Sequence, residues 1–399
     1  MRVLISGGGV AGLTLAYWLH QYTIQAVVIE QSDRLRGGGY GIDFYGTGYE
    51  VAERMGIIER LRSQRAPFES FDYVNKSGKP IASLTAELMQ KVASGKYIGL
   101  MHWILEEVLY ETLADQVEVR FGRSLTHVEQ RSADVVVTYN DGTSEPFDLL
   151  IGADGVHSNT RALVFGAEEQ YRHFLGYDFA SYHLADRYGL GQRWVMCVEP
   201  GRLAATYCSN QEGQLITFFM YQTTEWEHTP RAERLSRLRQ VFAGMGWVTP
   251  RLLADAPEPE EIFMDKVVQI HMPSWHQGRV ALVGDACDCP TFASGQGSSL
   301  AMGGAYLLAE ALHECADYQE AFSRYEQQMK PYVLEQQKKA RNLAGTFLPT
   351  STSGILLQRV MLKTLLRESF LGLLRQQFSA PSILPARSAH EVRQIRSTT

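Results

Sequence analysis

The first 30 residues alternate between short apolar runs and one stretch with helical spacing. Residues Val3 to Ser6 are apolar and too few for a core helix, which favours a buried strand. Apolar residues recur at helical spacing from Leu13 to His20, and a second apolar run, Ala26 to Ile29, ends at Glu30. The pattern predicts a strand, a helix and a second strand, which together make a βαβ unit.

The pattern changes from element to element between residues 49 and 155. A helix is predicted at 49–61, a hairpin within 68–84 and a second helix at 101–113. Three strand-like runs follow at 117–121, 125–129 and 135–139, and Asn140-Asp141-Gly142 is a strong turn sequence. We interpret these runs as a small antiparallel β-meander inserted in the first half of the chain. A buried strand is predicted to lead into the turn at 152–155.

The pattern of apolar and polar residues changes near residue 171, and the new pattern lasts to about residue 266. Aromatic, strand-like runs at 194–198, 203–207 and 215–221 precede a predicted helix at 231–245, which indicates a second, mixed β/α domain. A buried strand at 279–284 is followed by predicted helices at 298–312 and 318–344. Residues 355–377 predict a surface helix that packs on the body through Leu357, Val360 and Met361, and the tail after it is polar.

Composition narrows the class of protein. With 399 residues, 45% hydrophobic and 21% charged, the chain suggests two globular domains. A net charge of −6 gives no reason to expect a nucleic acid or an acidic membrane as partner, and no apolar run approaches membrane-spanning length. The five cysteines are odd in number and scattered, which favours a reducing cytoplasm, and the chain starts directly at the first strand, without room for a signal peptide. Cys287 and Cys289 have no second Cys/His pair, so we expect no metal site.

The first turn carries the sequence G-x-G-x-x-G. Gly7 allows a tight turn, Gly9 lets the backbone approach a pyrophosphate, and Gly12 lets the helix pack close to the strand. The helix N-terminus offers unpaired N–H groups to phosphates, and Glu30 is placed to accept hydrogen bonds from ribose hydroxyls. Glycine loops are also common simple turns, but the flanking strands and the acid favour dinucleotide binding.

Three later segments supply further candidates. The glycine-rich loop 37–41 is flanked by Arg36, which could face a phosphate or be a solvated surface residue, and by Asp43, which could accept from a ligand hydroxyl. A second turn contains Asp154 and Gly155. A third contains Gly284 and Asp285 and continues to the loop Gly295-Gln296-Gly297.

Together these segments resemble the FAD-dependent aromatic hydroxylases, the para-hydroxybenzoate hydroxylase-like flavoprotein monooxygenases. The family's second motif, D-G-x-x-S-x-x-R, stands intact from Asp154 to Arg161. Its third motif, G-D-A followed by a proline and G-x-G, stands as Gly284-Asp285-Ala286, Pro290 and Gly295-Gln296-Gly297. The resemblance covers about residues 1–345.

The resemblance implies an α/β fold: a Rossmann-like FAD-binding domain with the inserted β-meander, a second mixed β/α substrate domain and C-terminal helices. The FAD-binding domain would comprise 1–70, 99–170 and 267–345, the substrate domain 71–98 and 171–266, and the C-terminal helix and tail 346–399. The implied cofactor-binding residues are Gly7, Gly9, Val10, Ala11, Gly12, Glu30, Arg36, Asp43, His102, Asp154, Asp285, Pro290, Gly295, Gly297 and Ser298.

The resemblance also implies roles. Glu30 would hold the adenosine ribose and Asp285 the ribityl chain, with Asp43 in support, and Arg36 would contact NAD(P)H. The helix that begins near Gly297 would direct its N–H groups at the flavin N1–C2=O edge. The chain departs from the family where His102 replaces an arginine, Asp288 a histidine and Gly303-Gly304 an acidic residue. These departures and the C-terminal helix resemble the tetracycline-inactivating and polyketide-modifying branch.

Three functions are compatible with the motifs. The first is an NAD(P)H- and O2-dependent FAD monooxygenase acting on an aromatic or polycyclic small molecule, as monomer or homodimer. The others are an FAD oxidoreductase that inserts no oxygen, and a flavin-binding sensor. Since the flavin carries the chemistry, no protein acid or base is named. Strand alternation leaves two candidate pairs for the substrate wall, Phe218 with Met220 or Phe219 with Tyr221.

Overall fold

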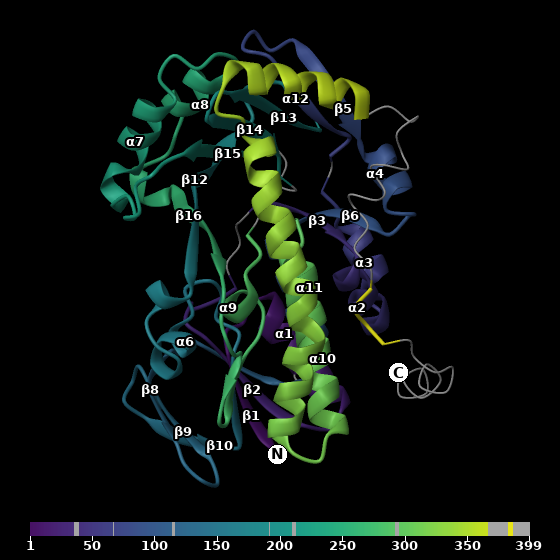
Figure 1. Cartoon of the computed structure of the whole chain (residues 1–399), viewed down its shortest axis with the longest axis vertical. Coiled ribbons are helices and arrows are strands. Elements are labelled where there is room, and N and C mark those ends of the chain that lie inside the picture. Colours follow the sequence, from purple (N-terminus) through teal and green to yellow (C-terminus); the bar gives the residue numbers. More distant parts are fainter. Residues whose placement is uncertain are drawn as a thin grey trace.

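The computed structural model describes residues 1–35, 40–66, 68–113, 116–190, 192–209, 213–291, 295–365 and 382–385. Two sheets form the two ends of the molecule, and one long helix, α11 (Tyr318–Phe347), runs between them (Figure 1). The predicted α/β class is confirmed.

The first sheet is mainly parallel. Its strands, in spatial order, are β17 (His276–Gln277), β18 (Val280–Leu282), β11 (Leu149–Gly152), β1 (Arg2–Ser6), β2 (Gln25–Glu30) and β7 (Glu118–Phe121). Val3, Leu4 and Ile5 are all fully buried, as expected for a parallel strand that is covered on both faces. The predicted βαβ unit is therefore present at the centre of this sheet.

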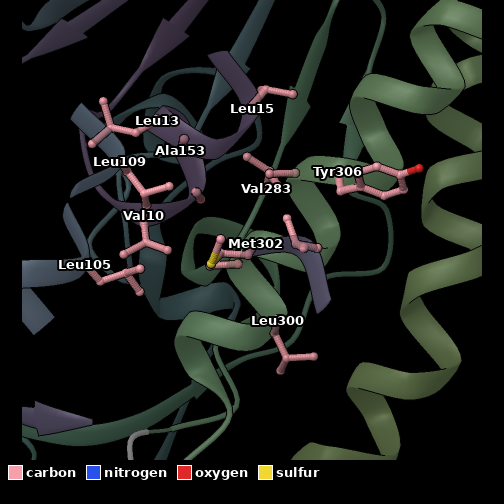
Figure 2. Packing of buried hydrophobic residues seen from close by; sticks show 14 of the residues in the cluster. Val10, Leu13, Leu15, Leu105, Leu109, Ala153, Val283, Leu300, Met302 and Tyr306 are labelled. Atoms are coloured by element: carbon pink, nitrogen blue, oxygen red, sulfur yellow. The ribbon is translucent and has the colours of Figure 1, made fainter. Parts of the chain in front are cut away.

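Helices cover one face of the parallel sheet and a small antiparallel sheet covers the other. The helices are α1 (Val10–Gln21), α5 (His102–Leu113) and α10 (Gly297–Glu314). Figure 2 shows Val10 of α1 beside Leu105 and Leu109 of α5, with Met302 of α10 nearby. The opposite face packs on β8 (Leu125–Gln130), β9 (Val135–Tyr139) and β10 (Ser144–Phe147).

Two details of the elements predicted for the first half of the chain are wrong. Residues 118–121 form β7, which pairs in parallel with β2 and does not belong to the meander, because the chain reaches it through the crossover helix α5. The predicted helix at 49–61 is two helices, α2 (Thr47–Met55) and α3 (Ile58–Ser63). Gly56 separates them at φ +75°, the left-handed conformation that ends a helix.

The second sheet is mainly antiparallel and contains the aromatic strands. Its order is β16 (Phe263–Ile270), β12 (Arg172–Ala185), β15 (Gln214–Gln222), β14 (Arg202–Cys208), β13 (Arg193–Glu199), β4 (Ser70–Val74) and β5 (Pro80–Thr85). Helices α7 (Arg234–Val241) and α8 (Thr249–Ala254) cover its outer face, and its inner face packs toward the parallel sheet.

Shorter elements connect the two sheets. Strands β3 (Gly41–Tyr45) and β6 (Tyr97–Met101) form a two-stranded ribbon, and α4 (Ala86–Val92), α6 (Asn159–Val164) and α9 (Asp285–Asp288) are short helices.

Helix α12 (Thr352–Leu365) lies over β5 and β13 (Figure 1). Its buried positions are Ile355 and Gln358, whereas Leu357 and Val360 are 62% and 58% exposed. The apolar face predicted to pack on the body is therefore wrong, because α12 sits on the sheet through a different stripe. The rest of the predicted 355–377 helix lies outside the described residues. In the part of the chain that the structure describes, no helix has the length and apolarity needed to cross a bilayer.

Candidate active site

A cavity of about 340 Å³ opens at the carboxyl ends of the parallel strands. This is where α/β sheets bind their ligands, in the crevice outside the strand ends. Segments far apart in the sequence meet there: the first glycine loop, the end of β2, the turn after β11, the start of α9 and the start of α10. The predicted cofactor-binding residues that line this cavity are Gly7, Gly9, Val10, Ala11, Glu30, His102, Asp154, Asp285, Gly297 and Ser298.

Other predicted residues lie elsewhere. Gly12, Pro290 and Gly295 are not among the described residues that line the cavity. Asp43 also lies outside it, on β3, where it accepts a hydrogen bond of 2.7 Å from the Tyr97 hydroxyl. Arg36 lies outside the described residues, so its predicted contact with NAD(P)H stays a prediction.

The three glycines of the first loop have different physical roles. Gly7 has φ +119°, and a Cβ there would lie 2.3 Å from the Ala153 carbonyl oxygen. A Cβ on Gly12 would lie 1.9 Å from the Gly7 carbonyl oxygen. Both glycines are therefore required by the packing of the loop itself.

Gly9 is different, because its backbone tolerates a side chain. It caps α1 with φ −85°, and a Cβ would lie 3.4 Å from its nearest described neighbour, Glu106 Oε1. Since no side chain caps this helix end, its first N–H groups face the cavity and can bind a phosphate. The open space at Gly9 fits the pyrophosphate of a dinucleotide.

Glu30 closes the end of β2 at the cavity wall. Its Oε2 accepts from the Gly8 backbone N–H and its Oε1 accepts from the Ser32 N–H, each at 2.9 Å. These two bonds fix the carboxylate, and each oxygen retains a lone pair for a ligand hydroxyl. The arrangement suits the predicted ribose contact.

The D-G-x-x-S-x-x-R motif joins two turns of the site. Asp154 accepts hydrogen bonds from the Ser158 hydroxyl and, at 2.8 Å each, from the backbone and hydroxyl of Thr160. Arg161 is 0% exposed and donates to the carbonyls of Val156 (2.7 Å) and Ala286 (2.8 Å). Asp154 therefore shapes the turn with its carboxylate, and Arg161 ties that turn to α9.

A charged cluster at the rim was missed by sequence reasoning. His157 lines the cavity and lies between Glu168 (3.1 Å) and Asp265 of β16 (3.0 Å). These two carboxylates raise the pKa of His157 to about 10. The imidazolium thus bridges the parallel sheet and the second sheet at neutral pH. In the sequence, the only signal for His157 was its position inside the D-G-x-x-S-x-x-R motif.

Asp285 begins α9 at the cavity wall. Burial raises the pKa of its carboxyl group, an effect that the charge of His102 and a hydrogen bond from the Cys289 thiol oppose. A partly buried carboxylate of this kind needs hydrogen-bond donors, and the hydroxyls of a ribityl chain are suitable.

We therefore expect Asp285→Ala to weaken FAD binding by roughly 1–3 kcal/mol, the range for losing a hydrogen bond to a charged group. The measurement is the dissociation constant of FAD from the quenching of its fluorescence. The melting temperature of the flavin-free variant serves as control and should stay close to that of the parent. An unchanged dissociation constant would assign this aspartate to structure alone.

The packing of the second sheet shows which of the two candidate pairs lies on its inner face. Phe218 and Met220 pack in the same hydrophobic cluster as Val10 and Leu300 of the parallel-sheet half. Phe219 and Tyr221 pack under α7, where Phe219 lies 5.0 Å from Phe242, centroid to centroid. The Phe218/Met220 pair therefore lies on the inner face of the second sheet, although neither residue lines the cavity at the strand ends.

A compact aromatic group extends this inner wall. Trp194 and Tyr207 stack at 4.0 Å, and Phe68 meets both rings edge-on. The Gly41 N–H donates to the Tyr207 hydroxyl at 2.9 Å, which attaches the wall to β3. Beside it a second cavity, of about 1100 Å³, is lined in part by Phe68, Phe71 and Tyr97.

Comparisons with known proteins agree with this site. A family model described as an FAD binding domain matches residues 1–335. A flavin-dependent monooxygenase from an unknown prokaryotic organism is 32% identical over 351 residues, which cover 87% of this chain and 90% of the relative.

Solved structures show the same architecture. The crystal structure of the tetracycline destructase Tet(55) has a TM-score of 0.83 at 27% identity and covers 96% of this chain and 98% of its own. Klebsiella pneumoniae HpxO, solved with FAD and uric acid, shares the fold with a TM-score of 0.78 at 22% identity, covering 94% of this chain and 96% of its own. The chain belongs to the FAD binding domain family and, with its relatives, to the flavin-dependent monooxygenases.

Proposed function

We propose that this monooxygenase uses NAD(P)H and O2 to insert one oxygen atom into a fused-ring aromatic or polyketide substrate of the tetracycline type. Bound FAD supplies the oxygen chemistry, and the chain supplies the position of the ring and a dry wall opposite it. The observation that carries the substrate class is the inner face of the second sheet.

That inner face is broad and apolar. Its buried side chains come from four adjacent strands and are Tyr177, Phe179, Met196, Val198, Leu203, Ala205, Tyr207, Ile216, Phe218 and Met220. Such a wall suits a flat, extended molecule, whereas a small charged acid would need a buried cation opposite it. The likeness to Tet(55), named a tetracycline destructase, supports the same class.

The test is oxygenation of a substrate panel. The purified protein, supplied with NADPH in air, should oxidise NADPH faster with a tetracycline or another fused-ring polyketide, and the product should gain one oxygen atom by mass spectrometry. Simple phenols in the same assay should give little stimulation, because they leave most of the wall uncovered. A clear preference for a single-ring hydroxybenzoate would contradict the substrate class and leave the monooxygenase assignment in place.

We further infer that the enzyme works in the cytoplasm as a monomer or homodimer. All five cysteines are free in the structure, and three of them, Cys197, Cys287 and Cys289, are buried. Unpaired buried thiols of this kind are typical of reducing compartments.

A further inference from the structure

The loop between α9 and α10 is held from behind by two buried glutamines. The helices on either side of this loop line the FAD cavity, α9 through its first residue, Asp285, and α10 through its first residue, Gly297. In this loop, the carbonyl groups of Cys289 and Pro290 receive side-chain hydrogen bonds.

Gln337 of α11 provides the first anchor. It is 1% exposed, and its Nε2 donates to the carbonyls of Ile270 at 2.8 Å and Cys289 at 3.2 Å. The same two residues are also joined through the backbone, because the Ile270 N–H donates to the Cys289 carbonyl at 3.2 Å. One amide group therefore links helix α11, strand β16 and the loop.

Gln269 of β16 provides the second anchor. It is 0% exposed, and its Nε2 donates to the carbonyls of Pro290 at 3.1 Å and Gln337 at 2.8 Å. Its Oε1 accepts from Arg341 at 2.8 Å and contacts His271 Nε2 at 3.1 Å. Because an arginine can only donate, the bond from Arg341 identifies the Gln269 side-chain atom that it reaches as the amide oxygen.

The His271 ring remains a neutral partner in this network. Burial, together with the neighbouring His173 and Arg341, lowers the pKa of His271 to about 4. A neutral imidazole can donate its single N–H to Gln269 Oε1 without placing a charge in the core.

The network connects the loop to the second sheet. Strand β16 starts at the edge of that sheet and ends at Gln269 and Ile270, beside α9 (Figure 1). Helix α11 continues toward α12, which lies over β5 and β13 of the same sheet. A displacement of the second sheet relative to α11 would therefore break hydrogen bonds to Cys289 and Pro290.

We propose that Gln337 and Gln269 are positioning residues of the flavin reaction: they fix the Cys289–Pro290 peptide, and through it the starts of α9 and α10 that line the FAD cavity, in register with the second sheet. A buried carbonyl that loses its donor is costly, so the bonds donated by Gln269 and Gln337 favour one position of the Cys289–Pro290 peptide. The inference rests on the FAD assignment and is independent of the proposed substrate class.

Two variants of Gln337 test this. Gln337→Leu removes both donated bonds, and Gln337→Glu keeps the size of the side chain while replacing the donating amide with a carboxyl group. We expect either variant to bind FAD about tenfold more weakly, which corresponds to about one lost hydrogen bond. With a turned-over substrate, NADPH oxidation should continue while a larger share of it yields hydrogen peroxide and a smaller share oxygenated product.

Gln336→Leu is the matched control, because Gln336 is also buried on α11 and is the adjacent glutamine. It should retain the parent's FAD affinity and its ratio of product to NADPH. If the Gln337 variants matched Gln336→Leu in both quantities, the network would be packing only and the proposal would fall. Should Gln337→Leu not fold, Gln337→Glu decides the question, and should no substrate be turned over, the FAD affinities decide it alone.

Discussion

A Gly9→Val variant is expected to fold like the parent protein and to purify without FAD. The backbone of Gly9 has φ −85°, and a Cβ there would meet its nearest described neighbour only at 3.4 Å. The added side chain would instead occupy the space in front of the α1 N-terminus, where we expect the pyrophosphate of FAD to bind. The absorbance of bound flavin per mole of protein, measured beside far-ultraviolet circular dichroism, checks both parts of the prediction.

Gly12→Val is the informative comparison. A Cβ at Gly12 would lie 1.9 Å from the Gly7 carbonyl oxygen, so this variant should lose the fold itself along with the cofactor. The two variants therefore separate a glycine required for ligand access from one required for packing. A folded Gly9→Val protein with full FAD content would show that the pyrophosphate does not bind at this helix end.

Asp288→Asn is expected to stabilise the protein at neutral and alkaline pH. Asp288 is 1% exposed, and neither of its oxygens has a hydrogen-bond partner among the described residues. Burial, and secondarily the charge of Asp285, raise its pKa well above the ordinary value of 3.8. The folded protein therefore keeps the proton of this group to a higher pH than the unfolded chain does.

The sign of the pH dependence follows from these two states. At pH values below 3.8 the group is protonated in both states, so its ionisation does not change the stability. As the pH rises from there toward the folded-state pKa, the unfolded state is favoured by about 1.4 kcal/mol per pH unit. Asparagine does not ionise, so the gain in the free energy of unfolding from Asp288→Asn should grow as the pH rises above 3.8.

Denaturant unfolding of the FAD-saturated proteins at pH 5 and pH 8 measures this difference. The gain from Asp288→Asn should be larger at pH 8, and Asp33→Asn at an exposed position should leave the profile of the parent unchanged. A loss of stability at pH 8 would mean that Asp288 is ionised and paired in the folded protein.

Much of the fold could be predicted from local patterns in the sequence. The βαβ unit is recognisable because the period of apolar residues changes from strand to helix and back within 30 residues, and the turn residues lie at the changes. The motif from Asp154 to Arg161 is local in the same sense, since Asp154 bonds to Ser158 and Thr160 within one turn. The break at Gly56 was missed because a single glycine is compatible with either one helix or two.

The sequence did not show which face of a strand or helix packs against a neighbouring element, because periodicity defines the faces but not their partners. A strand sends neighbouring side chains to opposite faces, so the Phe218/Met220 and Phe219/Tyr221 pairs were equivalent until α7 was seen to cover the second pair. The exposed stripe of α12 is a case of the same kind, because helical periodicity does not say which stripe meets the sheet.

The sequence by itself determined the family of this protein, the presence of FAD and the glycines, acids and turns from which the cofactor site is built. The tertiary structure alone decided that Asp43 lies with Tyr97 outside the cavity. It also decided that Gln269 and Gln337 meet behind the loop. The physical reason is range: a turn or a helix end is specified by neighbours in the chain, whereas hydrogen bonds between residues 68 positions apart depend on how whole elements pack.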